Sequence, residues 1–141
     1  MRSLILNIIW LLLAGFWLAV GYAVTGFVLF FTVIGIPFGI QLLKLAGFAF
    51  WPFGRAVVPD PTASTPVSVV GNLLWFFLVG WWLALIHVVA GIAMTVTIIG
   101  IPLGLALFKM TGLALLPFGR RVVDAGSTAQ LPPGSVVVRA G

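Results

Sequence analysis

Two long apolar runs dominate the pattern of hydrophobic and polar positions. Residues 3–43 contain no ionisable side chain except Tyr22, and residues 62–108 contain none except His87. A helix needs about 20 residues to cross a hydrocarbon core of ~30 Å, so each run has roughly twice the length of one crossing. The pattern predicts transmembrane helices near residues 4–22, 24–43, 69–87 and 89–108.

The two runs belong to an internal repeat. Residues 7–58 recur at 72–123 with a fixed offset of 65 and no gap, and 25 of the 52 aligned positions are identical. The clearest element is Thr-Val-Ile-Gly-Ile-Pro-Phe-Gly at 32–39, which returns as Thr-Ile-Ile-Gly-Ile-Pro-Leu-Gly at 97–104. Two crossings per repeat return the chain to its starting side. We therefore expect parallel halves, unlike the inverted repeats of many transporters.

Each predicted helix pair needs a turn, and a further apolar element follows it. Turns are expected around Gly21-Tyr22 and Gly26 in the first repeat, and around His87 to Gly91 in the second. The further elements, residues 45–53 and 110–118, are too short to cross a bilayer. Aromatic side chains at their ends suit the head-group level, which favours a short interfacial helix, and a partly re-entrant loop is the alternative.

Composition divides the chain into four segments. Membrane repeat 1 covers residues 1–58, a Pro- and Ser-rich cytoplasmic linker covers 59–68, membrane repeat 2 covers 69–123, and a flexible tail covers 124–141. Within the tail, the three valines at 136–138 are expected either to form a short edge strand or to have no regular structure.

The repeated Gly-Ile-Pro motif predicts a bend in the second helix of each pair. Proline removes a backbone donor and clashes with the carbonyl group four residues back, so we expect kinks at Pro37 and Pro102. Glycines four residues apart lie on one helix face, where another backbone can approach closely. These glycines are Gly35, Gly39, Gly100 and Gly104. Two interpretations stay open: a bend used for packing, or a break whose freed carbonyl groups coordinate ions.

Three polar side chains inside the apolar runs are candidates for a pathway or a gate. Thr32 and Thr97 precede the predicted kinks, where a hydroxyl group either bonds a carbonyl one turn back or faces a pathway between several copies of the chain. His87, the only histidine, takes the position of Tyr22 in the other repeat. Its imidazole either anchors at the outer membrane interface or acts as a proton or ion gate.

Other polar and aromatic side chains favour structural roles. Asn7 and Asn72 stand one turn into their helices and are expected to form interhelical hydrogen bonds. Most tryptophans are expected in aromatic belts or on lipid-facing surfaces. They are Trp10, Trp17, Trp75, Trp81 and Trp82.

Composition and charge support a membrane location and suggest an orientation. The 141 residues are 62% hydrophobic and 6% charged, with a mean hydropathy of +1.30. Short cytoplasmic loops are enriched in Lys and Arg. The basic residues avoid the predicted turns, and they are Arg2, Lys44, Arg55, Lys109, Arg120, Arg121 and Arg139. Both termini and the linker are therefore expected in the cytoplasm. The flanking charges are expected to meet lipid head groups, and no nucleic-acid motif accompanies them.

The sequence contains few side chains that could act as catalytic acids, bases or nucleophiles. The chain has no Cys and no Glu, and its carboxylates are Asp60 and Asp124, which we expect to be local partners of Arg55 and of Arg120/Arg121. General acid–base pairs and triads need partners within reach, and His87 is predicted on the opposite side of the membrane from both aspartates. We expect no enzyme activity, no metal site and no cofactor.

The doubled motifs resemble a known family. Asn-x-x-Trp, Gly-Trp-Trp-Leu-Ala at 80–84, Ile-Ile-Gly-Ile-Pro at 98–102, Lys109 and Pro-Phe-Gly-Arg-Arg at 117–121 are similar to the YccF family, bacterial proteins built from two inner membrane component domains. The resemblance implies a multi-pass protein of the bacterial inner membrane. It implies no activity and no catalytic residue. The halves differ at Phe16, Gly21, Tyr22 and Trp51, so we do not expect them to be interchangeable.

The predicted fold is an all-α integral membrane protein of two parallel tandem repeats, each a helical hairpin with a Gly/Pro-kinked second helix and a short interfacial helix. Two classes of function fit it. One is a homo-oligomeric channel or small transporter for ions or small solutes, because four helices leave little lumen in one copy. The alternative is a non-catalytic accessory protein that packs with membrane lipids or with a larger membrane complex.

Overall fold

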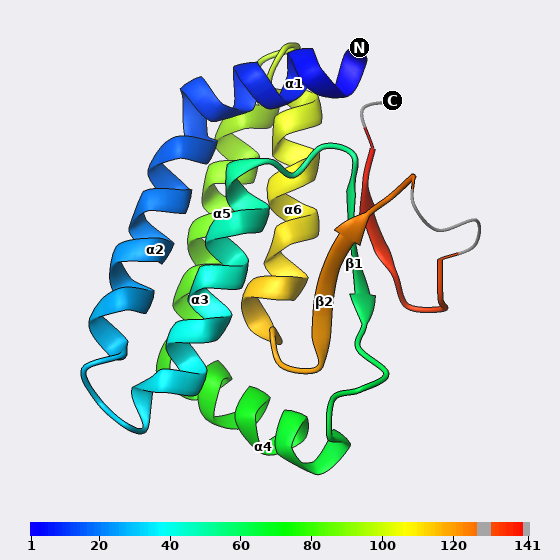
Figure 1. The fold of residues 1–141 in the computed structure, drawn as a ribbon. Helices are drawn as coiled ribbons and strands as arrows, with labels where there is room; N and C mark the ends of the chain where they lie inside the picture. Colours follow the sequence, from blue (N-terminus) through cyan, green and yellow to red (C-terminus); the bar gives the residue numbers. More distant parts are fainter. Residues whose placement is uncertain (127–130, 140–141) are drawn as a thin grey trace.

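The computed structural model describes residues 1–126 and 131–139, which form mainly helices and one small sheet (Figure 1). Residues 127–130 and 140–141 of the predicted tail lie outside the described residues. In chain order the elements are α1 (Arg2–Trp10), η1 (Leu11–Gly15), α2 (Phe16–Leu29), α3 (Gly35–Phe50), β1 (Arg55–Pro59), α4 (Thr65–Trp75), η2 (Phe76–Gly80), α5 (Trp81–Thr95), α6 (Ile101–Leu115), β2 (Arg120–Asp124) and β3 (Val136–Val138).

Two helices in the described part of the chain are long and apolar enough to cross a membrane. They are Arg2–Leu29 and Thr65–Thr95, with 28 and 31 residues and mean hydropathies of 2.3 and 2.2. Helices α3 and α6 have 16 and 15 residues, hence lengths of about 24 and 22 Å at 1.5 Å per residue. Both are shorter than the ~30 Å core of a bilayer. The structure therefore has two helices of sufficient length where the sequence predicted four.

The predicted hairpin turns are wrong. Tyr22 and Gly26 lie inside α2, and His87 and Gly91 lie inside α5. The chain reverses instead at residues 30–34 and 96–100, directly before α3 and α6. Gly26 and Gly91 are packing positions within helices, which is why a turn assigned from small residues falls too early.

The predicted proline kinks are also wrong. Pro37 and Pro102 lie in the first turns of α3 and α6, where backbone N–H groups have no partner inside the helix. Proline therefore removes no helical hydrogen bond there and helps to begin a new helix. The long helices change direction at the π-helical turns η1 and η2 instead, so that α1 and α4 cross the ends of the hairpins (Figure 1).

The short interfacial helices expected at residues 45–53 and 110–118 are not separate elements. Most of the first segment is the end of α3, and most of the second is the end of α6. After each helix the chain passes through a turn with a glycine at positive φ, Gly54 at 90° and Gly119 at 77°, and then enters a strand. The linker predicted at 59–68 contains the first residues of α4, which begins at Thr65.

The described strands form one antiparallel sheet in the order β2-β1-β3. Strand β1 is central and mostly buried, with Val57 opposite Val122 of β2 and opposite Val136 of β3. Of the two alternatives for residues 136–138, the structure has the edge strand. The all-α prediction therefore missed a small sheet that joins the two repeats.

The equivalent segments of the two repeats run in opposite directions within the molecule, so helix pairs that stood upright in a membrane would be inverted relative to each other, where the sequence predicted upright and parallel halves. Val57 and Val122 occupy equivalent repeat positions and face each other in an antiparallel pair. An approximate twofold axis must therefore pass between them. In Figure 1 the α2–α3 turn and the α5–α6 turn accordingly lie at opposite ends of the molecule. Upright helices would therefore form an inverted repeat, whereas a twofold axis along the membrane normal would give both repeats the same orientation.

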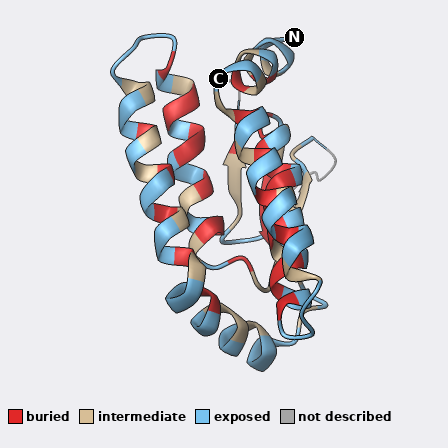
Figure 2. Ribbon diagram, turned by 90° about the vertical axis from the view of Figure 1, so that its left-hand side faces the viewer, coloured by how far each residue is buried: buried red, intermediate tan, exposed pale blue. Residues whose placement is uncertain are grey.

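The core lies where the two hairpins and the sheet meet. Its fully buried aliphatic side chains come mainly from α3 and α6, including Leu42, Leu45, Leu103 and Leu107. Figure 2 shows exposed residues along the outer faces of the helices and buried ones where helices face one another. The aromatic rings of Phe38 and Trp75 stack across the repeats, with centroids 5.9 Å apart.

Candidate functional site

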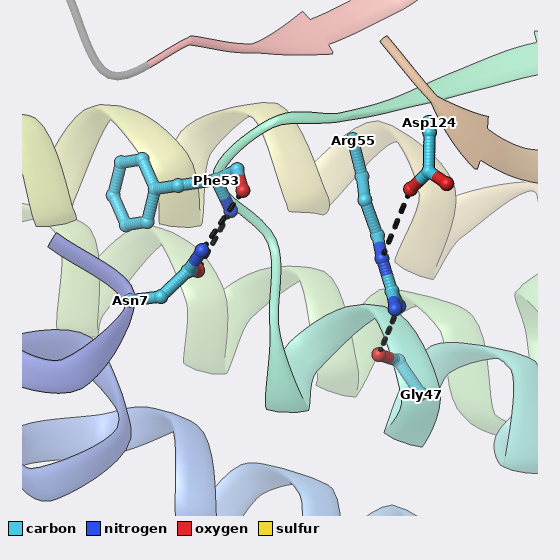
Figure 3. Close-up of polar contacts among 5 residues, drawn as sticks. All are labelled: Asn7, Gly47, Phe53, Arg55 and Asp124. Carbon is cyan, nitrogen blue, oxygen red and sulfur yellow. Dashed lines mark hydrogen bonds and ion pairs between the residues drawn. The ribbon is translucent and has the colours of Figure 1, made fainter. Parts of the chain in front are cut away.

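One asparagine in each repeat connects the start of a long helix to the turn before a strand, and Figure 3 shows the first of them, Asn7. The Asn7 side chain donates to the Phe53 carbonyl at 2.9 Å and accepts from the Phe53 N–H at 3.0 Å. Asn72 makes the equivalent pair of bonds with Phe118, at 3.0 and 2.9 Å. Each asparagine thus binds backbone outside a helix, where the sequence predicted bonds between helices.

Two tryptophans are fully buried, although the sequence placed them in an aromatic belt. The Trp10 indole N–H donates to the Ala49 carbonyl at 2.6 Å, and Trp75 donates to the Ala114 carbonyl at 2.7 Å. A Cβ atom at Gly15 would lie 2.2 Å from the Trp10 ring. The missed signal is the pairing of a tryptophan with a glycine five residues later in both repeats. Trp17, Trp81 and Trp82 are exposed, as a lipid-facing role requires.

The predicted pathway threonines lie in the two hairpin turns. Thr32 donates to the Leu29 carbonyl at 3.1 Å and accepts from the Gly35 N–H at 3.0 Å. Thr97 makes the same two contacts in its own repeat, at 3.2 and 3.0 Å. Because the turns lie at opposite ends of the molecule, the two hydroxyl groups do not share a pathway within one copy (Figure 1).

The glycines of the Gly-Ile-Pro motif occupy two kinds of position. A Cβ atom at Gly39 would lie 2.6 Å from the Gly26 carbonyl oxygen, and one at Gly104 would lie 2.7 Å from that of Gly91. These residues let the two helices of each hairpin approach closely. Gly35 and Gly100 instead lie against their own turns, where a Cβ atom would meet backbone oxygens at 2.3 and 2.0 Å.

His87 meets its repeat equivalent, Tyr22, at the centre of the molecule. The Tyr22 hydroxyl lies 3.0 Å from Nε2 of His87, while Nδ1 lies 2.7 Å from the Leu83 carbonyl. A carbonyl oxygen only accepts, so Nδ1 carries a proton. Both side chains are buried, with 0% and 5% of their surfaces exposed, which contradicts an anchor at the outer interface. Among the described residues, every buried polar side-chain atom has a partner.

The sheet gathers the charged groups of both repeats. Lys44 donates to the carbonyl groups of Pro117 and of Arg120, the latter at 2.8 Å, and to the Gln41 side chain. Burial lowers the pKa of Lys44 from 10.5 to about 8. Its repeat equivalent, Lys109, is exposed and donates to the Val137 carbonyl at 2.7 Å.

The arginines and aspartates also act between repeats. Arg55 donates to the Gly47 carbonyl at 2.9 Å and lies 3.9 Å from Asp124 of the other repeat (Figure 3). The sequence predicted that Arg55 pairs with Asp60 and that Asp124 pairs with Arg120/Arg121, and the structure joins Arg55 to Asp124 across the sheet. Asp60 accepts from the backbone and hydroxyl of Thr62, and these bonds lower the pKa of its carboxyl group.

The opposite side of the molecule carries no charge. Helices α2 and α5 and both hairpin turns contain no Lys, Arg, Asp or Glu. Their apolar side chains are widely exposed, most strongly in the turns, where Val33 is 85% and Ile98 is 88% exposed. No group of three metal-binding side chains occurs among the described residues. The dominant chemical feature is thus a charged sheet opposed to an apolar helical surface.

Comparisons with known proteins agree with this surface. The sequence model described as YccF, inner membrane component domain, matches residues 5–55 and 70–120, one match per repeat. The proteins named "Inner membrane protein YccF" from Escherichia coli (strain K12) and Shigella flexneri are each 33% identical over 134 residues. Those alignments cover 89% of this chain and 90% of each relative. No solved structure matches significantly.

The two matches cover most of the chain, and both relatives are aligned over nearly their whole length. The resemblance found in the sequence motifs is thereby confirmed, as is the repeated domain organisation of the family. The chain belongs to the YccF family of inner membrane component domains.

Proposed function

We propose that this chain is a non-catalytic accessory protein of the inner membrane, embedded through its apolar helical surface with its sheet at the cytoplasmic face. The observation that carries the proposal is the separation of charge from apolar surface. All charged residues except Arg2 lie in the sheet, directly after its strands, or in hydrogen-bond contact with it, and Arg2 lines a cavity together with Val138 and Arg139 at the end of β3.

The orientation of the helices relative to the membrane follows from where α3 and β1 lie. Lys44 of α3 bonds the Arg120 carbonyl of β2, and Arg55 of β1 bonds the Gly47 carbonyl of α3, so α3 lies against the charged sheet. If α3 stood upright in the bilayer, Lys44 and the charged ends of the strands would lie at hydrocarbon depth. A charged residue at the centre of a membrane costs about 2.5–3.5 kcal/mol on insertion scales. An upright single copy is therefore unfavourable.

Turning the twofold axis along the membrane normal removes this cost. The helices then lie within one leaflet, and the sheet lies at the level of the head groups. The axes of packed helices are about 8–10 Å apart, so the axes of two helix layers fit within the ~15 Å depth of half a hydrocarbon core. The excess of basic residues supports a cytoplasmic position of the sheet, because Lys and Arg are enriched on that side of the membrane. Both repeats then have the same depth, as the twofold axis requires.

Single cysteines test this placement, because the chain has none of its own. We choose Val33→Cys and Ile98→Cys in the hairpin turns, with Thr62→Cys and Gly126→Cys as exposed positions near the sheet. With a membrane-impermeant maleimide, we expect labelling of residues 62 and 126 from the cytoplasmic side alone. Residues 33 and 98 should react from neither side until detergent is added. Labelling of residues 33 and 98 from opposite sides would establish upright helices and overturn the proposal.

The homo-oligomeric channel remains a prediction with less support. The side chains proposed for its pathway form hydrogen bonds within the chain: Thr32 and Thr97 bond their own turns, and His87 bonds Tyr22 and Leu83. Purified protein in liposomes, tested with several small ions, should show no flux above empty vesicles. Flux that His87→Ala abolishes in a folded protein would favour the channel, and native mass spectrometry would give the number of copies.

A further inference from the structure

One cavity combines positive charge with an apolar lining. It has a volume of about 650 Å³ and lies between the start of α1, the face of α6 and the end of β3. Arg2, Lys109 and Arg139 line it, one from each of these three parts of the chain. We call this cavity the basic cavity.

The basic cavity has no acidic side chain to balance its cations. The chain contains two carboxylate side chains, and neither Asp60 nor Asp124 lines the cavity. Lys109 gives one hydrogen bond to the Val137 carbonyl, which leaves two donors on its ammonium group. Three cations around one cavity attract an anion carrying oxygen acceptors, such as a phosphate group.

The rest of the lining suits a hydrocarbon chain. Ile5 and Leu6 of α1 lie on one side, and Pro102 and Leu105 of α6 lie on the other. Ile5 and Leu105 are 55% and 52% exposed, so they offer apolar contact to a molecule from outside. A ligand that satisfies both parts has an anionic head and an apolar tail.

The second repeat-related cavity provides an internal comparison. This apolar cavity, of about 490 Å³, lies between α3 and α4 and contains the repeat equivalents of several lining residues. Val67 takes the place of Arg2, while Val70 and Pro37 take those of Ile5 and Pro102. No residue that lines it, in the part of the chain that the structure describes, carries a charge. The two repeats thus offer the same apolar framework, and only one of them adds cations.

We infer that the basic cavity binds one anionic phospholipid, with the phosphate group between Arg2, Lys109 and Arg139 and the start of an acyl chain between α1 and α6. The inference rests on the proposed membrane placement, because that placement brings the sheet to the level of lipid head groups. Basic pockets between membrane helices are a common site for anionic head groups. The ligand class follows from the joint presence of the cations and the apolar lining.

The test is native mass spectrometry of the full chain in neutral detergent with added phosphatidylglycerol. We expect one bound lipid, and weaker binding of phosphatidylcholine with the same acyl chains. Arg139→Gln should weaken phosphatidylglycerol binding about fivefold, the effect expected for one basic residue near an anionic head group. Arg139 is exposed and follows the last strand, so its replacement should leave the fold intact. Arg2→Val, which copies the apolar cavity, should have a similar effect.

Arg121→Gln is the matched control, because Arg121 is exposed, carries the same charge and does not line the cavity. It should leave phosphatidylglycerol binding unchanged. An equal loss in this variant, or equal binding of phosphatidylcholine, would overturn the inference. Competition by glycerol phosphate at the same concentration would assign the site to a soluble anion and also overturn it. Because binding is measured in detergent, its outcome is separate from the cysteine test of membrane depth.

Discussion

Asn7 satisfies both backbone groups of Phe53 with one side chain, and it is fully buried. No water can replace it there, so its loss would leave a buried N–H and a buried carbonyl group without partners. Asn72 does the same for Phe118 but is only partly buried. At the scale of single residues, the two repeats therefore share the same asparagine–backbone contact. Its contribution to the free energy of unfolding should be larger in the first repeat, where the asparagine is more deeply buried.

We predict that Asn7→Ala lowers the free energy of unfolding by about 1–3 kcal/mol, the cost of unsatisfied buried polar groups. Asn72→Ala should have a smaller effect, because water reaches its partners. Thermal unfolding in detergent measures both. Thr25→Ala, which removes an exposed bond within its own helix, is the control and should change little. A larger loss for Asn72 than for Asn7 would contradict the prediction.

Lys44 should give stability a pH dependence, because burial lowers its pKa to about 8 from 10.5. In that interval the unfolded chain still binds the proton that the folded chain has released. The contribution of Lys44 to stability therefore rises with pH through this window. We expect the melting temperature of the wild type, relative to Lys44→Met, to increase between about pH 7.5 and about pH 10.

The matched control for this measurement is Lys109→Met, since Lys109 holds the equivalent position and is exposed. Its melting temperature relative to the wild type should change less over the same interval. A difference between wild type and Lys44→Met that stays constant with pH would show that burial does not perturb Lys44.

Single residues also show where sequence reasoning reached its limit. Asn7 and Asn72 were recognised as structural, because an amide near a helix start has few other uses in an apolar chain. The burial of Trp10 and the meeting of Tyr22 with His87 were not recognised. The meeting of Tyr22 with His87 depends on the relative direction of the two repeats, which a repeat offset does not give. The burial of Trp10 depends on contacts with Gly15 and Ala49 of its own repeat, which hydropathy does not show.

At the scale of elements, each hairpin depends on close approach between its two helices. The carbonyl of Gly26 lies where a side chain at Gly39 would begin, so α2 and α3 touch through backbone. Gly47 lies in the same helix α3 with nothing within 4 Å of an added Cβ atom. Gly39 therefore reports on the packing role of glycine, and Gly47 reports on its low helix propensity alone.

We predict opposite effects of alanine at these two positions. Gly39→Ala should lower the melting temperature, because its Cβ atom would meet the Gly26 backbone oxygen at 2.6 Å and push the helices apart. Gly47→Ala should raise stability by up to about 1 kcal/mol through higher helix propensity. Thermal unfolding of the two variants in one detergent provides the comparison. A stabilising Gly39→Ala would mean that α2 and α3 are not in backbone contact.

The helical character of the apolar runs was predicted better than the number of elements and their boundaries. The apolar runs correctly indicated helices, because no charge interrupts them. The Gly-Ile-Pro motif was interpreted as a kink, although Pro37 and Pro102 begin new helices. Proline signals both outcomes, and the choice depends on whether the preceding Thr32 and Thr97 close a turn. The strands at 55–59 and 120–124 were missed because each is short and follows directly after a long apolar helix.

At the scale of the whole molecule, the twofold axis can be tested by cross-linking. Val57 and Val122 face each other across β1 and β2, and directly opposed residues of an antiparallel pair have Cα atoms about 4.5–5.5 Å apart. That distance suits a disulfide bond. We predict that Val57→Cys with Val122→Cys forms an intramolecular disulfide on mild oxidation, detected by mass spectrometry.

The control pair is Val122→Cys with Val136→Cys, which flank β1 on opposite sides. Two strand spacings separate these positions by about 10 Å, too far for a disulfide bond. Cross-linking of the control pair alone would contradict the strand order β2-β1-β3.

The overall arrangement was the part that the sequence could not supply. Positive charges at Lys44, Arg55, Lys109 and Arg120 were interpreted as caps beyond the ends of upright helices. In the structure Lys44 and Lys109 lie within α3 and α6, and Arg55 and Arg120 lie in strands that follow these helices and fold back toward them. Hydropathy gives the length of an apolar run, but it does not show whether the segment after a helix leads away from that helix or folds back along it.

The twofold axis also limits what two identical halves could achieve. In a symmetric pair of separate chains, any change on one side would appear on the other, and both cavities would be the same. Joining the halves in one polypeptide removes this restriction, so Tyr22 can face His87, and Arg2 can stand where the other half has Val67. The fusion thus permits one half to acquire a binding specificity while its twin keeps a purely structural role.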